Sequence, residues 1–147
     1  MSLKDKLRDE LNAARKERDK IRTVLFTTTL SEIKYKEVEL GREATDAEVV
    51  DVISKAIKRR REAAEQMRAG NRAELAEKEE QEAALLSQYL PAQLSEAEVR
   101  EMVRAAIAEG ANTMGAVMGK IMPRIKGAFD GKEANRIVKE ELEKSSG

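Results

Sequence analysis

The sequence contains no cysteine and no histidine. These absences exclude disulfide bridges and zinc sites built from Cys and His. They also exclude a cysteine nucleophile and every reaction that needs an imidazole base. Carboxylate, lysine and serine chemistry stay open, but the sequence offers no nucleophile–base arrangement, no phosphate-cradling loop and no cluster of metal ligands. We therefore expect no catalytic residue, no cofactor and no metal, and no enzymatic activity of the chain on its own.

Aromatic residues and long apolar runs are also scarce. Aromatics make up 3% of the chain, so platforms for stacking unpaired bases are few. No apolar run approaches the roughly 20 residues of a membrane span. The first residues, MSLKDKLRDEL, lack the apolar region of a signal peptide. We expect a cytoplasmic protein with no membrane partner.

Charged residues are abundant and balanced. They make up 38% of the chain, with 28 basic and 28 acidic residues and a net charge of zero. This density is typical of exposed helices that carry ion pairs between residues four apart. A protein that binds nucleic acid along its whole length is usually basic. Any such binding must therefore come from a local patch.

Apolar residues recur with a helical period along most of the chain, and no segment reads convincingly as a strand. We predict an all-α fold with an N-terminal domain, residues 1–94, of about four helices and a small C-terminal domain, residues 95–147, of three. The signals for helix ends are Asp19, Thr45, Asn71, Ser95 and Asp130 as caps and Gly41, Gly70, Pro91 and Gly110 as stops.

Glycine and proline interrupt the most apolar, Met-rich stretch of the chain. Met114, Met118, Ile121 and Ile125 follow a 4-3-4 spacing that predicts a single buried face, with the Met residues filling an irregular core. Pro123 cannot donate a hydrogen bond to the carbonyl four residues before it. We therefore expect a kink, or a break and restart, between Gly119 and Pro123. The other structural positions of this motif are Gly115, where another backbone can approach closely, Gly127 in a special conformation, Asp130 and Gly131.

Basic residues gather in the same region. Between Asn112 and Lys139 there are six basic and two acidic residues, a local charge of +4. The predicted phosphate-binding residues are Lys120, Arg124, Lys126, Lys132, Asn135, Arg136 and Lys139. Four of them, between 132 and 139, share one face of the last helix. The run KRRR, residues 58–61, is interpreted instead as the solvated side of a long helix, paired with Glu62, Glu65 and nearby acids, although a basic ridge there stays open.

These stretches also carry a family resemblance. The segment MGAVMGKIMPRIKGAFDGKEANRIV resembles the signature of the GatB/YqeY family. The ordered series from LGREAT through YLPAQLSE to DGKEAN is similar to free-standing YqeY-like proteins over nearly the whole chain. Where relatives often read KGRADG, this chain has Ala128 and Phe129, which removes one basic candidate and adds an aromatic ring.

The resemblance implies an all-helical protein whose C-terminal domain is similar to the tail of the B subunit of glutamine-dependent aminoacyl-tRNA amidotransferase. In that enzyme the tail helps to hold tRNA, and other parts perform the amide chemistry. The family label, a carbon–nitrogen ligase with glutamine as nitrogen donor, rests on this shared domain alone. We interpret the chain as a non-catalytic binder of tRNA or other structured RNA. The alternatives are an accessory of such an amidotransferase and a protein-interaction adaptor.

Overall fold

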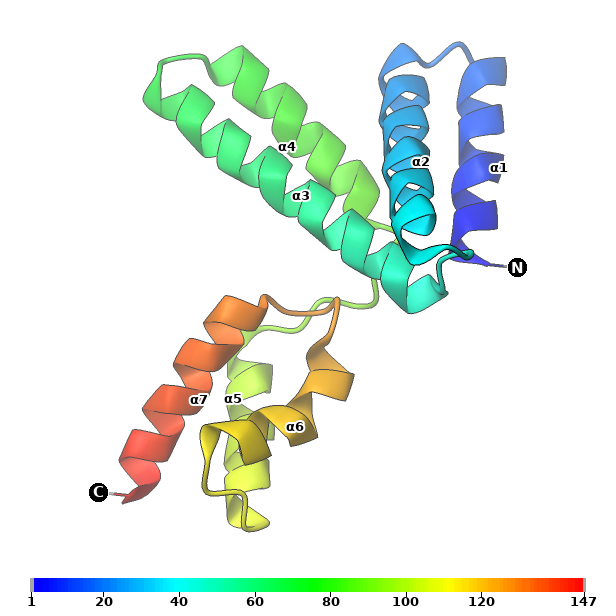
Figure 1. Cartoon of the computed structure of the whole chain (residues 1–147). Helices are drawn as coiled ribbons and strands as arrows, with labels where there is room; N and C mark the ends of the chain where they lie inside the picture. The colour runs from blue at the N-terminus through cyan, green and yellow to red at the C-terminus, as the bar shows by residue number, and fades with distance from the viewer. Residues whose placement is uncertain (1, 147) are drawn as a thin grey trace. The chain divides into compact units, whose positions relative to one another are not determined.

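The computed structural model describes residues 2–146 and confirms the all-α fold, because this part of the chain forms helices and no strand. The helices are α1 (Leu3–Lys16), α2 (Lys20–Leu40), α3 (Asp46–Ala69), α4 (Ala73–Ser87), α5 (Glu96–Ala108), α6 (Met114–Ile125) and α7 (Gly131–Ser146) (Figure 1). Contacts divide the chain into unit 1, Met1–Leu90, and unit 2, Pro91–Gly147. Within residues 2–146, no helix has the length and apolar character needed to cross a membrane.

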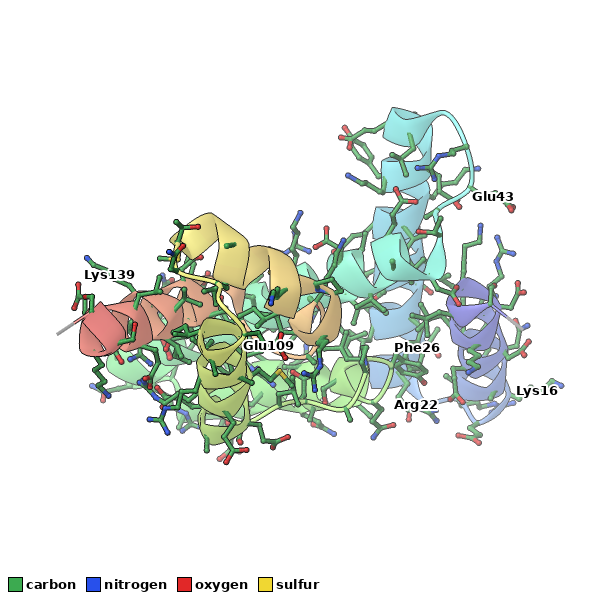
Figure 2. All side chains as sticks on the ribbon, turned by 90° about the horizontal axis from the view of Figure 1, so that it is seen from below. Lys16, Arg22, Phe26, Glu43, Glu109 and Lys139 are labelled. Atoms are coloured by element: carbon green, nitrogen blue, oxygen red, sulfur yellow. The ribbon has the colours of Figure 1, made fainter. Side chains whose placement is uncertain are left out.

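Unit 1 consists of the helix pair α1–α2 and the hairpin α3–α4 (Figure 1). Phe26 is the largest fully buried side chain of its core, with 1% of its surface exposed. Its ring meets the ring of Tyr89 edge-on at 5.8 Å. The Arg22 guanidinium lies 5.7 Å from the centroid of the Phe26 ring, and both residues are labelled in Figure 2. Such contacts add to the stabilisation that burial provides. The buried residues around it are Leu7, Leu11, Leu25, Ile33, Val49, Ile53, Ala56, Ile57, Ala83 and Leu86.

Local signals set most helix ends in unit 1. The Asp19 side chain accepts from the Arg22 amide at 3.0 Å, and Gly41 ends α2 with a φ of +72°. The predicted cap Thr45 forms a capping box with Glu48. The N-cap predicted at Asn71 is wrong. Asn71 itself takes a positive φ of 60°, so the next residue becomes the N-cap and makes no side-chain capping bond.

The β-branched run of three threonines lies within α2. Thr29 is fully buried, and its hydroxyl donates to the carbonyl of Leu25 at 2.8 Å. This bond satisfies the only polar group of a side chain that faces the core, so a poor helix former is accommodated in the helix interior.

Unit 2 packs α5, α6 and α7 around a second core. Its buried residues are Val99, Val103, Ala106, Ala111, Val117, Ile121, Ile125, Ala134, Ile137 and Val138. The predicted cap Ser95 forms a capping box with Glu98 at the start of α5. Just before it, the Leu94 amide donates to the carbonyl of Ala128 at 2.9 Å, and the Gln93 side chain donates to the carbonyl of Gly127 at 2.9 Å. The segment that follows Pro91 is thereby fastened to the turn between α6 and α7.

The helix α6 is continuous through Pro123, so the break and restart predicted as one alternative between Gly119 and Pro123 is wrong. The other alternative, a kink, stays a prediction. Both residues are exposed, and a Cβ placed on Gly119 would meet no atom within 4 Å. Water can therefore hydrate the carbonyl of Gly119, which loses its donor because Pro123 has no N–H.

The buried face of α6 also differs from the expected one. Ile121 and Ile125 are buried as predicted, but Met114 is 37% exposed and Val117 is fully buried. Met118 is half-buried against the same core. The buried stripe of α6 therefore starts one turn later than the Met residues suggested, at Val117, and Met114 is the first residue of the helix.

We expect Thr45→Ala to lower the free energy of unfolding by about 1 kcal/mol, because the Glu48 amide loses its acceptor at the start of α3. Urea denaturation followed by far-UV circular dichroism measures this change. Thr27→Ala on the exposed side of α2 is the matched control and should change stability by less than about 0.5 kcal/mol. Equal losses in the two variants would contradict the role of the cap.

Glu48 predicts a specific response to acid. The hydrogen bonds from Arg42, first, and from the Thr45 amide lower the pKa of Glu48 from 4.5 to about 2. A carboxyl group whose pKa is lower in the folded state stabilises the fold above its unfolded pKa. That stability is lost as the pH falls from 4.5 toward 2.

We therefore expect Glu48→Gln to be less stable than the parent at pH 6, with a difference that shrinks between pH 4.5 and 2. Denaturation curves at a series of pH values test this. Glu62→Gln, also on α3, controls for the loss of a carboxylate elsewhere on the helix. If the stability difference between Glu48→Gln and the parent stays constant down to about pH 2, the lowered pKa of Glu48 does not contribute to stability.

Candidate nucleic-acid interface

All seven residues predicted to contact phosphate lie on the surface of unit 2. They are exposed side chains of α6, of the turn after it and of α7: Lys120, Arg124, Lys126, Lys132, Asn135, Arg136 and Lys139. The structure separates them into two groups according to whether a carboxylate already binds them.

Arg136 is engaged within the protein. Its guanidinium contacts Glu133 at 2.7 Å, Glu96 at 2.7 Å and Glu140 at 2.8 Å. The hydrogen bonds to these carboxylates, that of Glu133 foremost, raise the pKa of Arg136 above its ordinary value. Because Glu96 is the first residue of α5, Arg136 joins α7 to the start of α5. A phosphate would have to compete with three carboxylates for this side chain.

Lys120 is also paired, although more loosely. Its Nζ lies 3.0 Å from a carboxylate oxygen of Glu109, the C-cap residue that follows α5 and is labelled in Figure 2. Both side chains are largely exposed, at 45% and 67%. Exposed pairs of this kind are weak, so this lysine remains exchangeable.

The other four cations are free of such partners. Within residues 2–146, Arg124, Lys126, Lys132 and Lys139 have no carboxylate oxygen within 4.0 Å. Unit 2 has nine basic residues, and the remaining five all form ion pairs: Arg100, Arg104, Lys120, Arg136 and Lys144. The free cations therefore all fall between residues 124 and 139. We call this set, together with the exposed Asn135, the basic surface.

The turn from α6 to α7 begins at Lys126, a member of the basic surface. Gly127 has a φ of +78°, the left-handed conformation expected there. The amides of Ala128 and Phe129 both donate to the carbonyl of Ile125, at 2.8 and 3.0 Å. Ala128 is buried and Phe129 is half-buried against the core, so the two residues that depart from the family pattern serve packing here.

The start of α7 is already capped. A carboxylate oxygen of Asp130 accepts from the amide of Lys132 at 2.8 Å, so a phosphate at this helix end would compete with it. Glu133 does not complete a capping box with Asp130 within the described residues; its carboxylate binds Arg136 instead.

Gly115 and Gly119 are exposed, and a Cβ at either would meet no atom within 4 Å. The close backbone approach expected at these glycines is therefore not made inside unit 2. Met122, 37% exposed, lies on the same helix one turn after Gly119.

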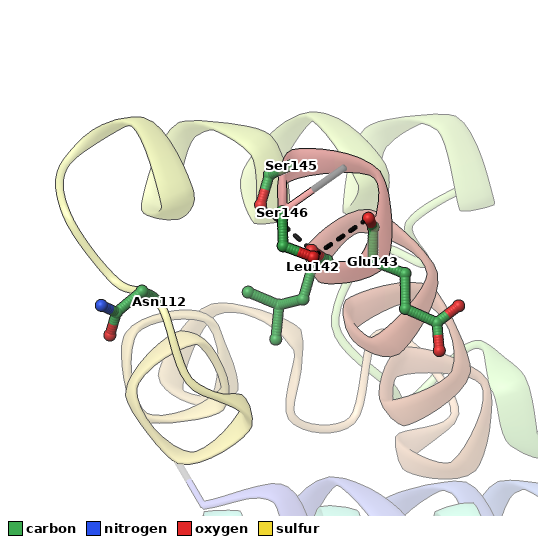
Figure 3. Close-up of a pocket in the computed structure, with 5 residues that line it drawn as sticks. All are labelled: Asn112, Leu142, Glu143, Ser145 and Ser146. Atoms are coloured by element: carbon green, nitrogen blue, oxygen red, sulfur yellow. Dashed lines mark hydrogen bonds between the residues drawn. The ribbon is translucent and has the colours of Figure 1, made fainter.

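Two further places carry none of the predicted residues. A shallow hollow lies between Asn112 and the last turn of α7, where the hydroxyls of Ser145 and Ser146 donate to carbonyls of their own helix at 3.2 Å (Figure 3). In the KRRR run, Arg59 binds Glu32 at 2.8 Å and Arg60 binds Glu82 at 3.3 Å. The partners come from α2 and α4, not from Glu62 or Glu65 as expected. No group of three or more acidic side chains within residues 2–146 is placed to hold a metal ion.

A buried carboxylate in unit 2 escaped the sequence reasoning. Glu141 is 4% exposed and accepts from Arg104 at 3.0 Å and from Arg100 at 3.2 Å. These bonds, that of Arg104 foremost, lower the pKa of Glu141. The signal available in the sequence was the spacing of Arg100 and Arg104, one helical turn apart, opposite two adjacent glutamates in the last helix.

Comparison with known proteins identifies the class of this two-unit, all-helical chain. The pattern of the YqeY-like proteins matches residues 4–142, and the chain belongs to this family. One relative, an uncharacterised protein of Schizosaccharomyces pombe, is 39% identical over 85 residues. The matched part covers 58% of this chain and 69% of that protein.

We expect Arg136→Gln to lower the melting temperature of the protein, because α7 loses its link to the start of α5. Lys132→Gln and Lys139→Gln should leave it nearly unchanged, because neither side chain has a carboxylate partner within the described residues. Differential scanning calorimetry of the three variants compares them directly. Equal effects would mean that the two groups of cations do not differ.

Proposed function

We propose that unit 2 binds structured RNA, tRNA above all, through the basic surface, and that the chain has no catalytic role of its own. The observation that supports this is the segregation of the cations. In a chain with zero net charge, Arg124, Lys126, Lys132 and Lys139 lie together along one stretch without carboxylate partners within residues 2–146. Unpaired cations of this kind attract phosphates and release counterions on binding.

The shortage of aromatic rings favours a folded RNA over a single strand. Phe129 is the only aromatic residue of unit 2, and it is half-buried against the core. Bases therefore find little to stack on, whereas backbone phosphates of a folded RNA find several cations. Asn135 can add a hydrogen bond to a phosphate or a ribose.

The family resemblance adds support for tRNA in particular, because the tail domain of the amidotransferase B subunit holds tRNA. By the same resemblance, this chain would add a tRNA-holding part to a separate glutamine-dependent ligase. This relation is part of the proposal, as is the cytoplasm as the compartment. Purification of an amidotransferase together with this chain would support it.

A protein-interaction adaptor is the second candidate. Met122 is 37% exposed, and Gly115 and Gly119 lie exposed on the same helix. An exposed apolar side chain beside two exposed glycines can form a surface on which a helix of another protein packs closely.

We expect tRNA binding to weaken with salt. If all four cations contact phosphates, the logarithm of the association constant should fall with the logarithm of salt concentration with a slope of about −3. In the double variant Arg124→Gln with Lys132→Gln, the slope should become shallower by about 2. Fluorescence anisotropy with labelled tRNA at several salt concentrations measures both quantities.

The matched control is Lys6→Gln with Lys78→Gln, which removes the same charge from exposed positions of unit 1. It should leave affinity and slope nearly unchanged. The RNA proposal fails if tRNA does not bind at low salt, or if both double variants reduce the slope equally. If both double variants still bind tRNA and only Met122→Glu loses binding, the contact is made through the exposed side of α6 rather than through the basic surface.

A further inference from the structure

The helix α2 has an apolar side that faces away from the core of unit 1. We call it the α2 outer face; it consists of Ile21, Val24, Thr28, Ser31, Tyr35 and Val38. All six residues are exposed, with Val24 at 63%, Tyr35 at 73% and Val38 at 72%. In a chain that is 38% charged, none of the six carries a charge. Four of the seven large hydrophobic residues exposed within residues 2–146 belong to this face.

The spacing of the α2 outer face is regular. Its members follow one another at intervals of 3, 4, 3, 4 and 3 residues, the a and d positions of three heptads. The residues of α2 that enter the core, Leu25, Phe26, Thr29 and Ile33, lie on the opposite side of the helix. A helix with two uncharged sides is typical of a helix that buries both of these sides against other protein surfaces.

We propose that the α2 outer face is the seam of a homodimer, in which α2 of a second copy packs against it in parallel orientation. The charges along the two edges of the face carry this choice. Lys20 and Lys34 lie on one edge, and Glu32 and Glu39 lie on the other.

Parallel pairing places Lys34 of each copy beside Glu39 of the other, five residues further along the chain. Neither Lys34 nor Glu39 forms an ion pair within residues 2–146. Antiparallel pairing would instead align lysines with lysines and glutamates with glutamates. A second copy in parallel therefore satisfies charges that one copy leaves unpaired.

The length of the seam sets the strength of the dimer. The helix has 21 residues, about 30 Å at 1.5 Å per residue. Thr28 and Ser31 in the middle add little apolar area. This interface belongs to the small class, so association is expected on the order of micromolar concentrations.

Sedimentation equilibrium of the whole chain from about 1 µM to about 1 mM tests the proposal. We expect the mass to double with concentration, and the double variant Tyr35→Glu with Val38→Glu to remain monomeric with an unchanged circular dichroism spectrum. Leu75→Glu, an exposed apolar position on α4, is the control and should dimerise as the parent does. A parent that stays monomeric throughout overturns the proposal, and so does a dimer that survives the double variant. The occupant would then be another protein, an RNA or the rest of this chain.

Charge exchange tests the orientation. Lys34→Glu should weaken the dimer roughly tenfold at low salt, because two attractive pairs become repulsive. Adding Glu39→Lys to the same chain should restore it. A single variant that strengthens association would show that like charges had faced each other, and would overturn the parallel arrangement.

The absence of cysteine allows a third test. A thiol introduced by Val24→Cys can pair only with its counterpart in another copy. Parallel helices place the two thiols side by side, so oxidation should yield a covalent dimer quickly. In the antiparallel arrangement that opposes residues 24 and 35, they would be 11 residues apart along the helices, about 16 Å. Lys78→Cys on α4 gives the background rate, and equal rates would contradict the parallel seam.

Discussion

Burial of one apolar stripe on each helix is the interaction on which this protein depends, because its sequence contains no cysteine or histidine for a disulfide or a zinc site. Each unit has its own core, with Phe26 in one and Ile121, Ile125 and Ile137 in the other. The shorter unit is near the size at which a single core barely suffices. Its helices gain a second kind of support from ion pairs that join residues about 40 positions apart, such as Arg100 with Glu140.

These ion pairs also decide which charges remain at the surface. The carboxylates of Glu96, Glu109, Glu140 and Glu141 bind cations on helices that lie beside them. Each pair contributes little stability where it is exposed. Its larger effect is to withdraw a cation from other ligands, so that the basic surface is narrower than the sequence suggested. A local charge of +4, counted along the chain, becomes four unpaired cations once the helices have packed.

Signals that act within one turn of helix could be predicted from the sequence. Asp19, Thr45 and Ser95 cap helices as expected, because a side-chain oxygen needs only the amide three residues later. The stop at Gly41 and the left-handed Gly127 follow from the same local geometry. Asn71 shows the limit of such rules. Asn and Asp are favoured at the start of a helix, but they also tolerate a positive φ. Asn71 takes a positive φ in the turn and does not cap the helix.

Features that depend on packing could not be predicted in the same way. Pro123 is accommodated inside α6 where the carbonyl of Gly119, four residues before it, is open to solvent. That exposure depends on how the whole unit folds. Met114 is 37% exposed although its spacing placed it on the buried face, because the packing of three helices decides which residues of a stripe are covered. The partners of Arg136 lie on two helices, and one of them is 40 residues away in the sequence. The sequence therefore predicted where the candidate basic surface lies, but it did not predict which of its cations lack a carboxylate partner.

The division of cations between those paired with carboxylates and those left unpaired has a consequence for ligand binding. Three of the arginines in unit 2 use their planar forks on carboxylates, whereas three of the four unpaired cations are lysines. A lysine is a mobile point charge that demands little of the geometry of its partner. Under the proposed function, such cations attract a phosphate-bearing ligand from a distance without fixing its orientation. If unit 2 binds RNA as proposed, this surface would recognise the density of phosphates and their arrangement in space rather than the order of bases.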